Sequence, residues 1–328
     1  MIAWIVGVCI AVIGLVLAAL ALFTAWTARQ VEKRVPPEGR FLEIDGERIH
    51  YVDEGSGPPL LLIHGLAGQT RNFTCALHGK LKQDFRVVIL DRPGSGYSTR
   101  SAAALANIAA QARTISRLCQ ALGLEQPLVV GHSLGGAVAL GLALNHPEQV
   151  AGLALLAPVT HQPERTPPPF DGLAIRLPLL RRLIASTVAT PLSIANRERA
   201  LDILFGPQPV PVDFAIAGGG LLALRPCSFV SASADLMAAH TDLNDMPTRY
   251  QGLTMPIGIL YGTADRVLDP AFHGNGLLAK VPSADLELIE GAGHMILIAS
   301  ADRVAAFIAR MAQRAAFADV KLAPAAQP

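Results

Sequence analysis

Short, uninterrupted apolar runs recur along the chain and constrain its fold more than any other feature. They occupy residues 60–63, 87–90, 128–130, 153–156 and 257–261. Continuous runs of this length are typical of strands covered on both faces, as in a parallel sheet. Stretches with helical spacing of apolar residues lie between and after these runs, at 101–122, 134–144 and 303–315. The alternation predicts an α/β fold with a mostly parallel, doubly wound sheet.

A β-hairpin is predicted before the first of these runs. Residues 41–45 and 48–53 alternate apolar and polar side chains around Asp45-Gly46. An Asp-Gly pair between two alternating segments is typical of a tight hairpin turn, because both central positions need positive φ. We therefore expect the globular part of the chain to begin near Arg40.

The alternation stops between about residues 160 and 247. Prolines divide this stretch into short apolar patches, and proline interrupts helices and strands. We expect a mostly helical cap that covers a site at the strand ends. The predicted organisation is a core at 40–159 and 248–318, a cap insertion at 160–247 and a flexible tail at 319–328.

The first 28 residues carry no charged side chain, and Trp4 and Trp26 lie near the two ends of this segment. A helix of about 20 apolar residues can cross a bilayer core, and tryptophan favours the two headgroup layers. We expect a single-pass membrane anchor at 1–28 that contacts the lipid bilayer, followed by a linker at 29–39. A cleaved signal peptide is the alternative, because Ala19-Leu20-Ala21 has a small-x-small pattern, although no basic region precedes it.

Charge and cysteine content narrow the choice of partners and compartment. Basic residues follow the apolar segment and none precedes it, so the positive-inside rule predicts a cytoplasmic catalytic domain. The formal net charge is +1, and no basic stripe is interleaved with aromatics, so nucleic acid is not a predicted partner. The four cysteines show no C-x-x-C spacing, which argues against a zinc site or redox pair. Protein partners are not predicted.

The most informative motif is Gly131-His132-Ser133-Leu134-Gly135, a G-x-S-x-G pattern. It follows the apolar run at 128–130 and precedes a predicted helix. A serine on such a sharp strand-to-helix turn has a strained backbone and projects its hydroxyl above the sheet. Because strand, turn and helix agree, we predict that Ser133 is a nucleophile.

A serine nucleophile needs a base, which a third group orients. His294 follows the strand-like residues 286–289 in a glycine-framed loop, and Asp265 follows the run at 257–261. Both loops are expected at the carboxyl ends of strands, where open α/β sheets bind ligands. We therefore predict His294 as the base and Asp265 as the acid. Asp269 is the rival acid, but it lies farther from the end of its strand.

An oxyanion hole is predicted from His64-Gly65-Leu66, which follows the apolar run at 60–63. A loop in this position presents backbone N–H groups to the oxyanion of a tetrahedral intermediate. We assign the two donors to the N–H groups of Leu66 and Leu134. Since both donors are main-chain groups, the site does not depend on the side chains at these positions.

These motifs, together with the loop at 91–98 and in this chain order, resemble those of the α/β-hydrolase fold family. The resemblance covers roughly residues 40–314 and implies an eight-stranded, mostly parallel sheet with a helical cap after the sixth strand. It places Ser133, Asp265 and His294 at the nucleophile, acid and base positions, and it implies neither a metal nor an organic cofactor. Ser133 speaks against the haloalkane dehalogenases and epoxide hydrolases of this fold, which use an aspartate there.

The resemblance predicts a serine hydrolase of the esterase or lipase type that acts on a small-molecule, ester-like substrate. The abundance of Leu, Ile, Phe and Pro in the cap favours an apolar acyl or alcohol group. A carbon–carbon bond hydrolase or a haloperoxidase-like enzyme would use the same triad. A ligand-sensing protein could also keep the fold and the triad, because fold does not determine function.

Overall fold

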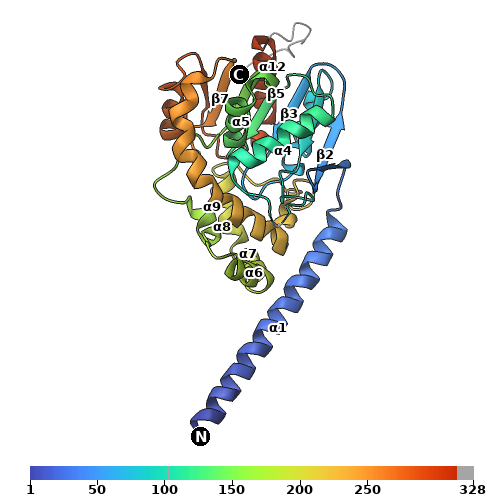
Figure 1. The fold of residues 1–328 in the computed structure, drawn as a ribbon, viewed down its shortest axis with the longest axis vertical. Coiled ribbons are helices and arrows are strands. Elements are labelled where there is room, and N and C mark those ends of the chain that lie inside the picture. Colours follow the sequence, from blue (N-terminus) through green and yellow to red (C-terminus); the bar gives the residue numbers. More distant parts are fainter. Residues whose placement is uncertain (102, 316–328) are drawn as a thin grey trace.

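Within residues 1–101 and 103–315, which the computed structural model describes, an eight-stranded sheet forms the centre of the molecule (Figure 1). Its strands are, in spatial order, β1 (Arg40–Ile44), β2 (Glu47–Glu54), β4 (Arg86–Leu90), β3 (Pro59–Ile63), β5 (Leu128–His132), β6 (Gly152–Leu156), β7 (Ile257–Gly262) and β8 (Asp285–Ile289). Strand β2 is antiparallel to both neighbours, and the strands from β4 to β8 are parallel. The predicted fold class is confirmed.

The central strands form the hydrophobic core, as their uninterrupted apolar sequences predicted. All residues of β5, β6 and β7 are buried, whereas the edge strands β1 and β8 are partly exposed. Each fully buried Val, Leu or Ile side chain contributes about 1.5–3 kcal/mol relative to exposure. The predicted hairpin is present between β1 and β2, with positive φ at Asp45 (53°) and Gly46 (79°) as its tight turn requires.

Helices cover both faces of this sheet (Figure 1). The helices of the core are α2 (Arg71–Thr74), α3 (His78–Leu81), α4 (Ile108–Ala121), α5 (Leu134–Asn145), α10 (Gly276–Leu278), α11 (Ile296–Ala299) and α12 (Ala301–Arg314). Helices α4 and α5 pack together on one face, and α12 contacts α3, β6 and β7. The predicted helices at 134–144 and 303–315 correspond to α5 and α12.

The predicted helix at 101–122 is wrong at its N-terminal end, because α4 begins only at Ile108. Asn107 is extended, with φ −71° and ψ 163°, and the start of the helix is capped from elsewhere in the chain. The carboxylate of Asp242 accepts hydrogen bonds from the Ala109 N–H (3.0 Å) and the Asn107 amide (3.3 Å). A cap supplied by a distant residue leaves no signal in the local sequence.

The stretch between β6 and β7 is mostly helical, in line with the predicted insertion at 160–247. Its α-helices are α6 (Pro178–Ser186), α7 (Ala189–Ala195), α8 (Arg197–Phe205) and α9 (Pro226–Arg249). Figure 1 shows α6, α7 and α8 below the sheet, with α9 running upward from them beside the core. Helix α9 continues through Pro247 to Arg249 and so passes the predicted end of the insertion. A proline in the last turn removes one helical hydrogen bond without ending the helix there.

Helix α1 (Ile2–Arg34) is long and apolar enough to cross a membrane, and it projects away from the globular body (Figure 1). It extends six residues past the predicted anchor at 1–28, so only residues 35–39 connect it to β1. The extension is stabilised by packing, because Val31 is buried against Leu222 of the insertion. The predicted tail at 319–328 lies outside the described residues.

Candidate active site

Ser133 lies on the sharp turn between β5 and α5, as the G-x-S-x-G motif predicts. Its backbone has φ 54° and ψ −120°, a conformation that costs a non-glycine residue about 1–3 kcal/mol. The flanking glycines permit this turn. A Cβ on Gly131 would lie 2.5 Å from the carbonyl oxygen of Gly135, and one on Gly135 would lie 2.1 Å from that of Ile63. The motif therefore reflects a close approach of α5 to the end of β3.

Asp265 and His294 form the second part of the site. His294 Nδ1 donates to Asp265 Oδ2 at 2.8 Å, and both side chains are buried. The other oxygen of Asp265 accepts from the N–H groups of Val267 (2.8 Å) and Leu268 (3.0 Å). Burial alone would raise the pKa of Asp265, but the facing His294 and these hydrogen bonds lower it below its ordinary value. The aspartate is therefore an ionised partner for the imidazole.

The rival acid Asp269 has a different environment. Its side chain is exposed, and its Oδ1 accepts from the N–H of Ala271 (2.8 Å), two residues farther along the chain. The pairing with His294 thus falls to Asp265, the residue nearer the end of β7. The loops that carry Asp265 and His294 are joined by a hydrogen bond from the Ala264 N–H to the Ala292 carbonyl (2.9 Å).

His132 brings the nucleophile turn and the His294 loop together. Its Nε2–H donates to the carbonyl oxygen of His294 (3.2 Å), and the two rings lie 4.9 Å apart between centroids. Burial, reinforced by the adjacent imidazole of His294, lowers the pKa of His132 to about 3. His132 is therefore neutral and places the imidazole of His294 beside the turn that carries Ser133.

The Ser133 hydroxyl faces a cavity of about 510 Å³, which opens between the sheet and the helices of the insertion. Within the described residues it makes no hydrogen bond, to His294 or to any other group. Contacts between a nucleophile and its base are often long without substrate and shorten in the reactive complex. Apolar side chains dominate the cavity wall; they include Leu66, Leu134, Val159, Phe170, Leu236, Met237, Leu243, Val267 and Leu268.

The residues that carry the two predicted oxyanion donors line this cavity together with Ser133. Leu134 is the first residue of α5, so its N–H has no helical carbonyl partner. Leu66 follows β3, and a Cβ on the preceding Gly65 would lie 2.9 Å from the Ser133 Cβ. The loop of Leu66 thus runs directly alongside the serine. This arrangement suits two N–H groups directed at one oxyanion.

Arg92, which we did not single out from the sequence, supports this loop from behind. Its side chain is fully buried and donates to the carbonyl oxygens of His64 and Gly65, at 2.9 Å each. It also forms an ion pair of 2.7 Å with Asp235 on α9, which is equally buried. Arg100 completes the cluster with a 2.5 Å contact to Asp235. The cluster connects the oxyanion loop to the long helix of the cap.

We expect Asp235→Ala to lower the free energy of unfolding by about 3–5 kcal/mol, because it leaves the buried charge of Arg92 without its partner. Urea unfolding of the full chain in detergent measures this loss. Glu287→Ala, which breaks the exposed pair with Arg310, is the control and should cost less than about 1 kcal/mol. Similar losses in both variants would contradict a structural role for the buried cluster.

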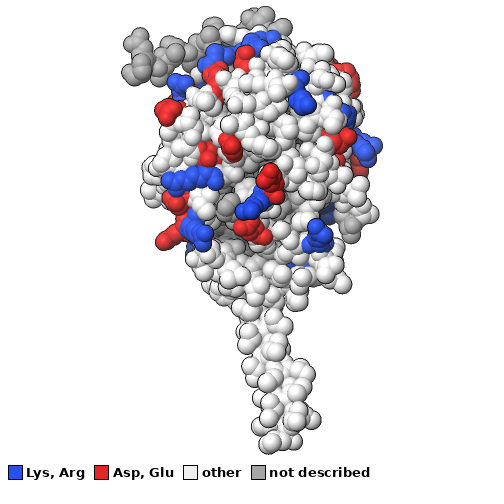
Figure 2. Space-filling model, turned by 90° about the vertical axis from the view of Figure 1, so that its left-hand side faces the viewer, with Lys and Arg blue, Asp and Glu red and all other residues white. Residues whose placement is uncertain are grey.

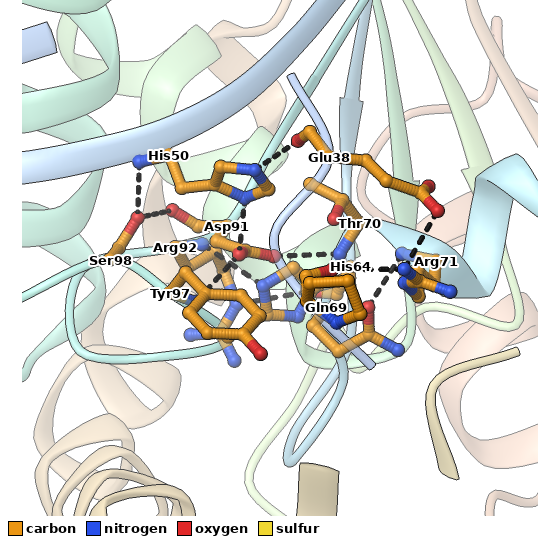
Figure 3. A network of polar contacts seen from close by, with 12 residues as sticks. Glu38, His50, His64, Gln69, Thr70, Arg71, Asp91, Arg92, Tyr97 and Ser98 are labelled. Atoms are coloured by element: carbon orange, nitrogen blue, oxygen red, sulfur yellow. Dashed lines mark hydrogen bonds and ion pairs between the residues drawn. The ribbon is translucent and has the colours of Figure 1, made fainter. Parts of the chain in front are cut away.

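Asp91 organises a second polar network beside the site (Figure 3). Its carboxylate accepts from His50 Nδ1 and the Thr70 N–H, at 2.7 Å each, and from the Tyr97 N–H at 2.8 Å. The loop at 91–98 thereby holds the segment after Leu66 and, through His50, the chain that leaves α1.

Buried neutral histidines predict a pH-dependent stability. Burial lowers the pKa of His64 and of His273 to about 4 and that of His132 to about 3, against an ordinary value of 6.5. Between pH 6.5 and about 4 the unfolded chain therefore binds protons that the folded chain does not. Stability is complete above pH 6.5 and falls as the pH falls through this window. Asp91 and Asp265, whose pKa values are lowered in the folded chain, change the stability only below about pH 4.

We expect the free energy of unfolding to fall between pH 7 and pH 5 by on the order of 1 kcal/mol for each of these histidines. Urea titrations at the two pH values measure the fall. His132→Gln removes one titrating group and should reduce the difference correspondingly. An unfolding free energy that stays constant between pH 7 and pH 5 would contradict the assignment of neutral buried imidazoles.

Comparison with known proteins places the chain in a family. The sequence model described as the alpha/beta hydrolase fold matches residues 58–197. An uncharacterized protein of Mycobacterium tuberculosis is 30% identical over 285 residues, which cover 81% of this chain and 78% of the relative. The 2-hydroxymuconate semialdehyde hydrolase of Pseudomonas putida is 29% identical, over 83% of this chain and 93% of that enzyme. The chain belongs to the α/β-hydrolase fold family.

Solved structures agree on the fold. The crystal structure of a bacterial membrane phospholipase A superposes with a TM-score of 0.68 at 24% identity, covering 95% of this chain and 99% of that one. The enol-lactonase of Burkholderia xenovorans gives a TM-score of 0.67 at 19% identity, over 84% and 100% of the two chains. The names of these proteins thus include a phospholipase, a lactonase and a semialdehyde hydrolase.

Proposed function

We propose that this protein is a serine hydrolase that cleaves an apolar carboxylic ester through an acyl-enzyme. The observation that carries the proposal is the convergence of Ser133, the paired His294 and Asp265, and the N–H groups of Leu66 and Leu134 at one end of the sheet. These five positions come from four separate loops or turns, which follow β3, β5, β7 and β8, each at the carboxyl end of its strand. A nucleophile, an oriented base and two main-chain donors are the groups that acyl transfer requires.

In the proposed reaction Ser133 Oγ attacks the ester carbonyl while His294 Nε2 accepts the hydroxyl proton. The N–H groups of Leu66 and Leu134 stabilise the oxyanion of the tetrahedral intermediate. The alcohol leaves with the proton from His294, and water then attacks the acyl-enzyme by the same route in reverse. Asp265, held by two backbone N–H groups, keeps His294 in the tautomer with the proton on Nδ1.

The walls of the cavity support an apolar substrate. A volume of about 510 Å³ is within the usual range for small-molecule sites. Leucine, valine, methionine and phenylalanine side chains line most of it, and Arg176, Gln162, Thr166 and His240 are its polar members. Burial of a substrate chain against these side chains gives about 0.8 kcal/mol for each methylene. Longer acyl groups should therefore bind more tightly.

The test is a series of p-nitrophenyl esters of increasing acyl length, assayed with the full chain in detergent micelles. The proposal expects kcat/KM to rise from the acetate to medium and long acyl esters. If the acetate ester were hydrolysed far faster than the longer esters, the argument for an apolar substrate would fail. No hydrolysis of any ester would favour the ligand-sensing alternative.

Carbon–carbon bond hydrolysis is the second candidate. It is favoured by the Pseudomonas putida relative, whose name is that of a semialdehyde hydrolase, and by a shared requirement for a serine triad. Arg176 in the cavity wall could pair with an acidic substrate. The same enzyme preparation, assayed against a vinylogous 1,5-diketo acid, distinguishes this candidate from an esterase.

We further propose that α1 holds the protein in a membrane and is retained in the mature chain. Its length and uninterrupted apolar composition support a span. The basic residues Arg29, Lys33 and Arg34 follow the span and support a cytoplasmic location of the catalytic domain. Intact-mass measurement of the protein extracted from membranes distinguishes a retained helix from a cleaved signal peptide.

A further inference from the structure

The position of the cap relative to α1 is fixed by several contacts. Thr24 is the first buried residue of α1, and its hydroxyl donates to the Thr187 carbonyl at 3.1 Å, between α6 and α7. Farther along, Val31 and Val35 pack with Leu222 of the cap in a small buried cluster. Helix α1 is therefore docked on the cap along its last three turns.

The residues after α1 are held as firmly by the core (Figure 3). Glu38 pairs with Arg71 at 2.7 Å, and Arg71 also donates to the Pro36 carbonyl at 2.9 Å. The Tyr97 hydroxyl donates to the Val35 carbonyl, and His50 contacts the Glu38 carbonyl. The connection between membrane helix and hydrolase core is thus a fastened segment, which restricts how the body can turn relative to α1.

The length of the exposed part of α1 indicates where the bilayer lies. Residues 2–23 precede the first buried residue of the helix and would span about 33 Å at about 1.5 Å per residue. This length matches the hydrocarbon core of about 30 Å. The bilayer surface then falls near Phe23 and Thr24, at the level of Thr187 and of the α6–α7 junction. Figure 1 shows α6 at the lower end of the body, beside α1.

This end of the cap carries an apolar surface, here called the cap face. Its leucine and isoleucine side chains are exposed to between 44% and 79% of their area; they are Leu177, Leu179, Leu180, Leu183, Leu192 and Ile194. Residues 179, 180 and 183 lie on one side of α6. On the side shown in Figure 2, the base of the body around α1 bears no charged side chain. Contiguous exposed apolar surface of this kind marks an interaction site.

We propose that the cap face lies on the bilayer into which α1 is inserted, so that the active-site cavity receives its substrate from the lipid surface. The inference rests on the proposed membrane anchoring and deepens the proposed function. The cavity wall includes Ala174 and Arg176, which directly precede the cap face in the chain. An acyl chain leaving the bilayer beside Leu177 and Leu180 would thus meet the cavity mouth.

Basic side chains at the same level as the cap face are suited to a layer of lipid headgroups. Arg176 and Arg182 are exposed and adjoin Leu177 and Leu183 of the cap face in the chain, and Arg29, Lys33 and Arg34 are exposed on α1 just beyond the inferred bilayer surface. Basic side chains next to an apolar face favour anionic phosphates, by about 1 kcal/mol for each residue near the surface. A bilayer is therefore favoured over a second protein as the occupant of the cap face.

The test measures contact with lipid in the full chain. Its exposed cysteines, Cys9, Cys75 and Cys227, are replaced by alanine, and Leu179→Cys or Leu183→Cys is labelled with an environment-sensitive fluorophore. The protein is reconstituted into phosphatidylcholine–phosphatidylglycerol vesicles that contain a lipid with a nitroxide in its upper acyl chain. Glu125→Cys, exposed in the loop before β5 at the opposite edge of the sheet, is the control.

Interfacial residues lie within about 5–10 Å of the acyl boundary, so we expect nitroxide quenching at 179 and 183 at least about threefold stronger than at 125. Quenching at 179 and 183 that does not exceed the control overturns the proposal. Energy transfer between labels on two copies of the chain also overturns the proposal, because a second copy then covers the cap face. This readout does not depend on catalysis.

A second experiment, which measures hydrolysis rates, tests whether substrate enters by way of the cap face. In Leu179→Asp/Leu183→Asp we expect the rate on a vesicle-embedded ester to fall about tenfold, the equivalent of one lost leucine contact with lipid. The rate on a short, water-soluble ester in detergent should stay within about twofold, because neither residue lines the cavity. An equal fall on both substrates contradicts the proposal and assigns these leucines to cap stability. Loss of all ester hydrolysis in the parent chain would count against the proposed function alone.

Discussion

Ser133→Ala should reduce kcat for ester hydrolysis by at least about 10⁴-fold, while leaving the fold intact. The hydroxyl is the group that forms the acyl bond, and removing the nucleophile of a serine triad leaves only binding and oxyanion stabilisation. The substitution should also leave the packing of the core unchanged, since Ser133 faces the cavity. Initial rates on a medium-chain p-nitrophenyl ester measure the effect, with burst kinetics reporting acyl-enzyme formation.

Ser283→Ala is the matched control for this loss. Ser283 is exposed in the turn before β8, at the edge of the sheet opposite the site, so its replacement should change the rate by less than about twofold. Circular dichroism of both variants confirms that the fold is retained. If Ser133→Ala kept activity within about tenfold of the parent, a nucleophilic role for this serine would be untenable.

Asp265→Asn should reduce kcat by about 10³–10⁴-fold, because an amide cannot hold His294 in the required tautomer or stabilise its protonated form. The substitution keeps the size of the side chain and one acceptor oxygen, so the N–H groups of Val267 and Leu268 stay paired. The comparison with Asp269→Asn makes the assignment of the acid specific. Asp269 is exposed, and its carboxylate accepts from the N–H of nearby Ala271, so its variant should retain activity within about threefold.

The reverse ranking, with Asp269→Asn inactive and Asp265→Asn active, would assign the acid to the rival residue. Equal, small effects in both variants would show that His294 acts without a carboxylate partner. The rates should be compared at several pH values, because an unpaired imidazole changes the pH dependence of kcat/KM as well as its maximum.

Local sequence patterns were sufficient to predict the parallel sheet and the strand ends at which the candidate triad residues lie. Strands buried on both faces need continuous apolar runs, and the turn at Ser133 needs glycines at 131 and 135 to avoid main-chain overlap. Both requirements act within a few residues, so they are visible in the sequence. The order of Ser133, Asp265 and His294 along the chain then follows from the strand ends that they occupy.

Features that depend on distant residues could not be predicted in this way. The start of α4 is set by Asp242 in the cap, and the buried role of Arg92 depends on Asp235, 143 residues away. Similarly, the helical extension of α1 to Arg34 is stabilised by packing against the cap. In each case the local sequence is compatible with several structures, and a tertiary contact selects one of them.

The central claim is that Ser133 is an activated nucleophile, and its most direct test is covalent labelling of the full chain with a fluorophosphonate. Such probes react with serine hydroxyls that a neighbouring base activates. Peptide mass spectrometry should find one adduct, on the peptide that contains Ser133, and none in Ser133→Ala. An unlabelled parent chain, or an adduct on a different residue, would contradict the account.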